Sequence, residues 1–221
     1  MARTANEDFF GYWEPDDDRA FDLKGRLVVV CDGMGGHIGG EIASRMAVKE
    51  CISFYESSPS DDIVDNLRKS IERANAAVHG EARKQPELMG MGTTCTAMVH
   101  RRGVVYFGQV GDSRAYLLRG GAMKHMTKDH SLVQQLVDEG LLDESEMETH
   151  PDKNVILRSL GVKPDVEVDV SHVPIINDDL LLLCSDGLSG LVSDAEMLAI
   201  VNQGLANSGS LRQICESLID A

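Results

Sequence analysis

Three apolar segments of the sequence each lead into an aspartate that is followed by a small residue. These aspartates are Asp32, Asp112 and Asp186, and a further acidic element, Asn6-Glu7-Asp8, lies near the N-terminus. A carboxylate just past a strand is held by a rigid scaffold yet faces the edge of the sheet, and a following glycine lets another group approach closely. If such strand ends converge, their like charges repel, and each carboxylate resists ionisation unless a cation compensates it.

The residue types at these strand ends determine which cation would suit them. Carboxylate oxygens combined with water are the ligands that Mg²⁺ and Mn²⁺ prefer, and no His-rich or Cys-rich spacing in the sequence favours zinc. Asp-Gly also forms ordinary turns. The residue pattern alone therefore leaves both a carboxylate metal site and simple turn formation open.

The hydrophobic pattern predicts helices in two blocks. Apolar residues recur at helical spacing over 41–54 and 61–83. Capping-box patterns at Ser131, Ser193 and Ser210 predict three more helices, the first of which ends near residue 139.

Strands are predicted between and after these blocks. The apolar runs 27–31 and 180–184 are typical of strands buried on both faces. Glycine turns separate strand-like segments at 93–100, 104–110 and 114–118, which predicts an antiparallel meander, and 165–172 alternates as in a half-buried strand. Because helices come in blocks and do not alternate with strands, the fold class is α+β, with antiparallel sheets covered by helices, and not a doubly wound parallel sheet.

Size and charge narrow the classes of function. The chain has 221 residues and no low-complexity linker, so we expect a single domain over 1–221. With 36 acidic against 21 basic residues, its formal charge of -15 repels nucleic acid and acidic membranes. A phosphorylated substrate is still compatible, because bound metal ions can invert the local field.

Cysteine usage and the N-terminal sequence predict a cytoplasmic protein. The five cysteines form no C-x-x-C pair, and Cys31, Cys95 and Cys184 lie in apolar segments, so we expect small buried thiols in a reducing compartment. The first residues contain no apolar segment typical of a signal peptide. The apolar runs are also shorter than a membrane span requires.

Several motifs occur in a fixed order that covers nearly the whole chain. This set resembles the metal-dependent protein phosphatase family, the type 2C serine/threonine phosphatases, in its bacterial form, and an ordered set is more specific than any single motif. The motifs are Arg3-x-x-Asn6-Glu7-Asp8, Asp32-Gly33-Met34-Gly35-Gly36-His37, Gly92-Thr93-Thr94, Gly111-Asp112-Ser113-Arg114, Thr127-Lys128-Asp129-His130-Ser131, His150-Pro151, Arg158-Ser159-Leu160-Gly161 and Ser185-Asp186-Gly187.

The resemblance implies a four-layer α-β-β-α sandwich with a two-metal centre in the cleft between the sheets. The ions are expected to be Mn²⁺ or Mg²⁺, with a third, weaker ion as in bacterial members. By position in the motifs, Asp32 should bridge two metals, the Gly33 carbonyl and Glu7 should bind one of them, and Asp186 the other. Asp112 should bind the third ion together with Asp186.

The resemblance also assigns roles next to the metals. Asp8 should orient the water that the metals activate, and Arg3 should bind the substrate phosphate, for which its planar fork is suited. Metal-activated water would attack phosphorus in line. The segment 127–161 corresponds to the family's flap beside the active site, which we expect to affect substrate choice.

Two departures from the family pattern stand out. The family ends with an Asp-Asn element and a final strand, whereas this chain ends at Ala221 without one, and the usual first strand before Arg3 is also absent. We therefore expect a fragment that lacks the first and last strands, which would leave sheet edges exposed. Met34 replaces a histidine proposed as general acid in eukaryotic members, although methionine is usual in bacterial ones.

Three hypotheses follow for the function. The leading one is a serine/threonine phosphatase that hydrolyses phosphoserine and phosphothreonine in phosphorylated proteins and opposes a Hanks-type serine/threonine kinase. The alternative is a pseudophosphatase or regulatory domain that binds phosphoproteins without turnover. The missing Asp-Asn favours that alternative, while the retained acidic motifs oppose it. The third is an acidic α/β domain with no metal site.

Overall fold

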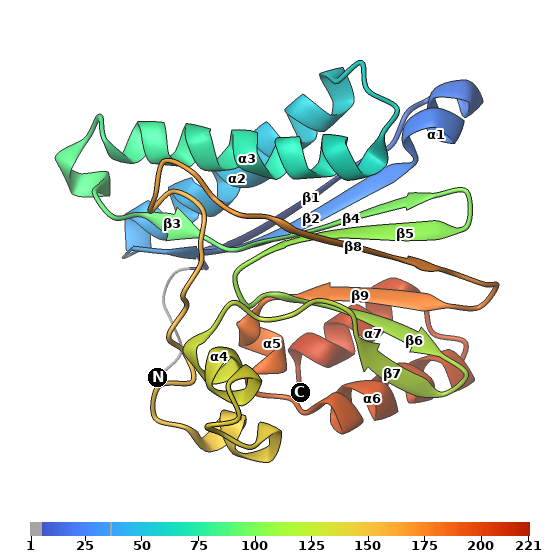
Figure 1. Ribbon diagram of the computed structural model, residues 1–221. Helices are drawn as coiled ribbons and strands as arrows, with labels where there is room; N and C mark the ends of the chain where they lie inside the picture. The colour runs from blue at the N-terminus through green and yellow to red at the C-terminus, as the bar shows by residue number, and fades with distance from the viewer. Residues whose placement is uncertain (1–5, 36) are drawn as a thin grey trace.

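Two antiparallel β-sheets pack face to face in the computed structural model, which describes residues 6–35 and 37–221. Figure 1 shows four layers, with one pair of long helices above the larger sheet and the C-terminal helices below the smaller sheet. The predicted fold class, an α-β-β-α sandwich, is therefore confirmed.

The larger sheet has the strand order β1-β2-β4-β5-β8, with β3 paired to the end of β2, and every pair is antiparallel. Its strands are β1 (Asp8–Trp13), β2 (Arg26–Met34), β3 (Gly92–Thr93), β4 (Cys95–Arg101), β5 (Val104–Val110) and β8 (Asp169–Pro174).

The smaller sheet has the order β7-β6-β9 and corrects one prediction. Its strands are β6 (Arg114–Arg119), β7 (Ala122–His125) and β9 (Leu180–Cys184). The predicted meander stops after β5, because β5 is already paired on both edges with β4 and β8, and β6 belongs to the other sheet. The chain crosses between the sheets at 111–113, where Gly111 has a φ of 103° that favours glycine.

Helices cover the outer face of each sheet (Figure 1). The larger sheet is covered by α2 (His37–Ser57) and α3 (Ile63–Ala82), and the smaller by α6 (Asp194–Ala206) and α7 (Leu211–Ile219). The short helices are α1 (Asp18–Lys24), η1 (Pro86–Leu88), α4 (Leu132–Asp138), η2 (Glu144–Thr149) and α5 (Asp186–Ser189). The predicted capping boxes at Ser193 and Ser210 are present, and Ser131 caps α4 by accepting from the Gln134 N–H.

The core lies mainly under the helices, and only a small cluster joins the two sheets. Met98, Val105, Phe107 and Ala115 are buried between the sheets. The prediction that the strands at 27–31 and 180–184 are buried on both faces is wrong. Burial alternates along β2, where Val28 on the inter-sheet face is partly exposed, and only Cys184 of β9 is fully buried. In the described part of the chain, three strands face a sheet of six and cover it incompletely.

Candidate active site

The site is built from carboxylates at the ends of strands from both sheets. Asp8 at the start of β1 is the direct partner of Asp32 on β2 in the antiparallel register. Side chains of directly opposite residues point to the same face about 5 Å apart, and like charges in such a pair destabilise a sheet. The pairing of two acids at this position is therefore not explained by strand stability.

The backbone of Asp32 is held rigidly by the threonines of the segment before β4. The Asp32 N–H donates to Thr94 Oγ1 at 2.8 Å, while the Thr94 N–H and Thr93 Oγ1 donate to the Asp32 carbonyl at 2.9 and 2.8 Å. These threonines stand in the Gly92-Thr93-Thr94 motif, so their effect is to fix the position from which the Asp32 carboxyl group reaches into the cluster.

Asp186 brings a carboxylate from the smaller sheet to the same place. It is the first residue of α5, directly after β9 and Ser185. Ser185 Oγ donates to Asp8 Oδ2 at 2.7 Å, which connects the end of β9 to the start of β1 across the two sheets. Burial, the charge of Asp8 and the adjacent carboxyl group of Asp186 raise the pKa of Asp32 to about 9.

Glycines allow Glu7 and Gly33 to approach the first turns of α2. A Cβ atom on Gly33 would lie 2.0 Å from the Gly40 carbonyl oxygen, and one on Gly40 would lie 2.9 Å from the Glu7 side-chain carboxyl carbon. The Glu7 carbonyl accepts from the Gly33 N–H at 3.1 Å and from Ser44 Oγ at 2.6 Å. The structure therefore places the Glu7 carboxyl group near the Gly33 backbone, which is compatible with the shared ligand role that the resemblance implies.

Asp112 extends the cluster from the crossover between the sheets. Its side chain is buried, with 8% of the residue exposed. Burial, followed by the charges of Asp186 and Asp129, raises the pKa of Asp112 to about 7. The charge of Asp186 contributes to the raised pKa of both Asp32 and Asp112, so Asp186 is close enough to act on each of them.

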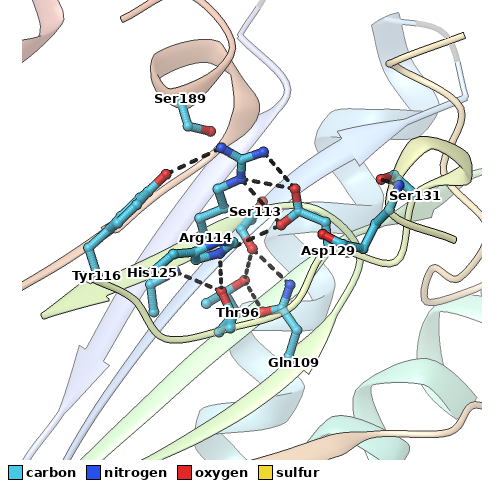
Figure 2. A network of polar contacts seen from close by, with 12 residues as sticks. Thr96, Gln109, Ser113, Arg114, Tyr116, His125, Asp129, Ser131 and Ser189 are labelled. Atoms are coloured by element: carbon cyan, nitrogen blue, oxygen red, sulfur yellow. Dashed lines mark hydrogen bonds and ion pairs between the residues drawn. The ribbon is translucent and has the colours of Figure 1, made fainter. Parts of the chain in front are cut away.

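A polar network surrounds Arg114, two residues after Asp112 in the chain (Figure 2). Nε and Nη2 of Arg114 donate to Asp129 Oδ2 at 2.9 and 2.7 Å, and Arg114 Nη1 donates to the Tyr116 hydroxyl at 3.3 Å. Arg114 pairs with the buried Asp129, and its charge offsets only part of the rise in the pKa of Asp112.

A cavity of about 490 Å³ adjoins the cluster. It is lined by Asp112 and Asp186, by the network residues Arg114 and Asp129, and by residues of the predicted flap such as Lys153. The cavity therefore connects the carboxylate cluster with the segment that the sequence predicts to influence substrate choice.

The donor chemistry of the cluster fits a hard divalent cation. Among the described residues, no ion pair links Asp8, Asp32, Asp112 or Asp186 to a basic side chain. Within the same part of the chain, no group of three His, Cys, Asp or Glu side chains is arranged so that it could hold a metal ion as it stands. Burial and the neighbouring carboxyl groups of Asp8 and Asp186 raise the pKa of Asp32 instead, and a cation among these groups would replace their repulsion by oxygen–metal contacts.

The structure brings most of the predicted site residues together. Glu7, Asp8, Asp32, Gly33 and Asp186 adjoin one another, and Asp112 is next to Asp186. Arg3 lies outside the described residues, so its predicted phosphate contact remains a prediction.

Sequence reasoning did not assign a role to four residues that support the site. Thr94 and Ser185 fix Asp32 and Asp8, and Asp129 and His130 link the flap to the segment carrying Asp112. All four stand inside the ordered motifs, which marked their positions in the sequence without indicating their contacts.

The fold and the carboxylate cluster together define a metal-dependent phosphatase, and comparisons with known proteins agree. The protein phosphatase 2C family matches residues 3–218. The serine/threonine phosphatase stp of Listeria innocua is 40% identical over 203 residues, which cover 90% of this chain and 78% of that protein.

Solved structures show the same relationship. The S. agalactiae serine/threonine phosphatase superposes with a TM-score of 0.86 at 34% identity, covering 100% of this chain and 88% of that chain. The catalytic domain of serine threonine protein phosphatase PstP in complex with 2 manganese ions gives 0.79 at 32% identity, covering 100% of this chain and 87% of that chain.

The chain belongs to the protein phosphatase 2C family, and it is a metal-dependent protein-serine/threonine phosphatase of bacterial type. Such enzymes act on phosphorylated proteins. The resemblance and the function predicted from the motifs are confirmed, and none of these findings supports a pseudophosphatase. No helix in the described residues is long and apolar enough to cross a membrane.

Proposed function

We propose that the carboxylate cluster holds two divalent ions, Mn²⁺ or Mg²⁺, and that Asp112 and Asp186 hold a third. Asp32 would serve both of the first two ions, Glu7 and the Gly33 carbonyl would hold one of them, and Asp186 would hold the other. The observation that supports this proposal is the convergence of Asp8, Asp32 and Asp186 from two sheets, with the pKa of Asp32 raised to about 9. Divalent cations are the natural partners of such a group of oxygen ligands.

The bound ions would make a water acidic enough to attack at neutral pH and would neutralise charge on the phosphate. Asp8 accepts from Ser185 Oγ at 2.7 Å and keeps acceptor capacity with which it can orient that water. Thr94 keeps Asp32 in register with Asp8 through its bond to the Asp32 N–H. Arg3 binds the phosphate oxygens in this proposal, which rests on the motif alone.

The substrates in this proposal are phosphoserine and phosphothreonine residues of proteins that a Hanks-type kinase modifies. The cavity of about 490 Å³ beside Asp112 and Asp186 supports a role of the flap in choosing these substrates.

We also infer a single domain over 1–221, supported by the cluster buried between the sheets. A cytoplasmic location is supported by the five free cysteines.

The test is Mn²⁺-dependent hydrolysis of a phosphothreonine peptide by the wild type, by Asp32→Asn and by Asp61→Asn. Asp61 is an exposed acid in the loop before α3, so its variant controls for the change from aspartate to asparagine. We expect activity that rises with Mn²⁺ in the wild type and the control and falls at least 100-fold in Asp32→Asn. Equal activity in all three proteins would show that Asp32 is not a ligand.

A further inference from the structure

His130 holds the residue before Asp112 by both of its backbone polar groups. The His130 N–H donates to the Gly111 carbonyl at 2.9 Å, and His130 Nδ1 accepts from the Gly111 N–H at 3.1 Å. The side chain is 7% exposed, so these bonds are shielded from water. Gln109 Nε2 also donates to the Gly111 carbonyl at 3.0 Å.

The bond to Gly111 determines which tautomer His130 adopts. Because Nδ1 accepts a hydrogen bond, the neutral ring carries its proton on Nε2, which lies 3.2 Å from Asp169 Oδ2 and donates to it. Arg158 Nη1 donates to the other oxygen of Asp169 at 2.7 Å and lies 3.1 Å from Nε2. Burial lowers the pKa of His130, in agreement with a neutral ring.

The backbone conformation and the surroundings of Gly111 exclude a residue with a side chain. Its φ is 103°, and a Cβ atom would lie 2.6 Å from Thr94 Cγ2. Thr94 is the residue that also holds Asp32. The backbone that carries Asp112 is therefore fixed on one side by Thr94 and on the other by His130.

His130 is also the base of the flap. Its carbonyl accepts from the Leu157 N–H at 2.7 Å, and the next residue, Ser131, bridges to Ile156. Leu132 N–H donates to the Val155 carbonyl at 2.8 Å, so the two ends of the flap are joined at this point. The flap base and the backbone of Asp112 thus meet in a single side chain.

We propose that His130 is a positioning residue that aligns Asp112 for metal binding and ties this alignment to the base of the flap. The inference rests on the proposed role of Asp112 as a ligand. His130 itself touches neither metal nor substrate. It acts by keeping the Gly111 backbone in the one orientation from which the Asp112 carboxylate reaches Asp186.

The variants separate the two contacts of the ring. His130→Asn keeps an acceptor near the position of Nδ1 and loses the reach to Asp169, whereas His130→Ala loses both. Asp169→Asn retains a hydrogen-bond acceptor but removes the charge beside Nε2. His172→Ala is the control, because His172 is an exposed histidine on β8, the strand that carries Asp169.

The measurements are calorimetric Mn²⁺ binding and the Mn²⁺ concentration that half-activates phosphopeptide hydrolysis. Residues that orient metal ligands typically change affinity by about 10–100-fold. We therefore expect His130→Ala to weaken the weakest binding step and raise the half-activating concentration about tenfold, with His130→Asn within about threefold of the wild type. A thermal melt of each variant checks that it folds.

A double-mutant cycle with Asp112→Asn tests whether His130 acts through Asp112. In the Asp112→Asn background, His130→Ala should change neither Mn²⁺ binding nor half-activation further. Wild-type Mn²⁺ binding in both His130 variants would overturn the inference, as would a full tenfold effect of His130→Ala in that background. If Asp112→Asn alone leaves Mn²⁺ binding unchanged, the ligand assignment is wrong, whatever His130 does. If His130→Ala does not fold, His130→Asn provides the test. Because asparagine keeps the acceptor for the Gly111 N–H, a folded His130→Asn that binds Mn²⁺ as weakly as Asp112→Asn would overturn the inference.

Discussion

Replacing Asp32 by asparagine should stabilise the metal-free protein while it abolishes activity. Asp32 faces Asp8 across the strand pair and contacts Asp186, so without a cation its carboxyl group is held protonated. Asparagine has the shape of the protonated acid and keeps a hydrogen-bond donor for these neighbours. The repulsion that the wild type carries is absent in the variant.

The pKa of Asp32 sets the size of this effect. It rises from an ordinary value of 3.8 to about 9, and each pH unit between the two values costs about 1.4 kcal/mol of folding stability. The unfolded chain releases this proton above pH 3.8, whereas the folded chain keeps it until about pH 9. The wild type therefore loses stability as pH rises through this window, by about 4 kcal/mol at pH 7 before relaxation.

Local rearrangement and partial exposure reduce this loss of stability. We therefore expect Asp32→Asn to be more stable than the wild type by about 2 kcal/mol at pH 7, or roughly 4–8 °C in Tm for a domain of this size. The assay is thermal unfolding in EDTA at pH 5, 7 and 8, with Asp61→Asn as the control. The advantage of Asp32→Asn should grow with pH and reverse when Mn²⁺ is added. A variant less stable than the wild type at pH 8 in EDTA would refute the reasoning.

Three further changes have defined outcomes. Mn²⁺ at about 100 times its Kd should stabilise the wild type by about 2.7 kcal/mol, seen as a rise in Tm of roughly 5–10 °C that EDTA reverses. Gly33→Ala, whose Cβ would lie 2.0 Å from the Gly40 carbonyl oxygen, should lose this Mn²⁺ response. Gly80→Ala, in the last turn of α3 where a Cβ atom would meet nothing within 4 Å, should keep the response and gain up to about 1 kcal/mol. Ser193→Ala removes the cap of α6 and should cost about 1 kcal/mol in urea unfolding, with kcat unchanged because α6 covers the outer face of the smaller sheet.

The elements and the acids at their ends could be predicted from the sequence because both depend on local signals. Apolar periodicity defined α2 and α3, and serine caps defined the starts of α6 and α7. The continuous run at Leu180–Cys184 is the strand β9 with these bounds.

Sheet membership could not be predicted in the same way because it depends on contacts between distant segments. The segments 104–110 and 114–118 look like neighbouring strands of one meander in sequence, yet β5 is occupied on both edges and β6 pairs with β9, some 65 residues further along the chain. The partial exposure of Val28 has the same origin, because the extent of the second sheet is not encoded in β2 itself.

The contacts that support the site could not be predicted from the sequence for a related reason. Ser185 and Asp8 are 177 residues apart, and His130 and Asp169 are 39 apart, so no spacing rule connects them. The ordered motifs indicated which residues matter. Only the three-dimensional arrangement indicates that Thr94 and His130 hold the backbones of Asp32 and Asp112.

The placement of the carboxylates has a consequence for how the two sheets stay together. Asp8 and Asp32 belong to the larger sheet, and Asp186 follows the last strand of the smaller one, so their repulsion acts across the sandwich. The hydrophobic cluster that opposes this repulsion has four buried residues, Met98, Val105, Phe107 and Ala115, with six partly buried ones packed against them. A cation among the carboxylates replaces repulsion between the sheets by shared attraction. In the proposed site, metal binding would therefore stabilise the packing of the two sheets as well as the local geometry of the site, and loss of the metal would weaken both together.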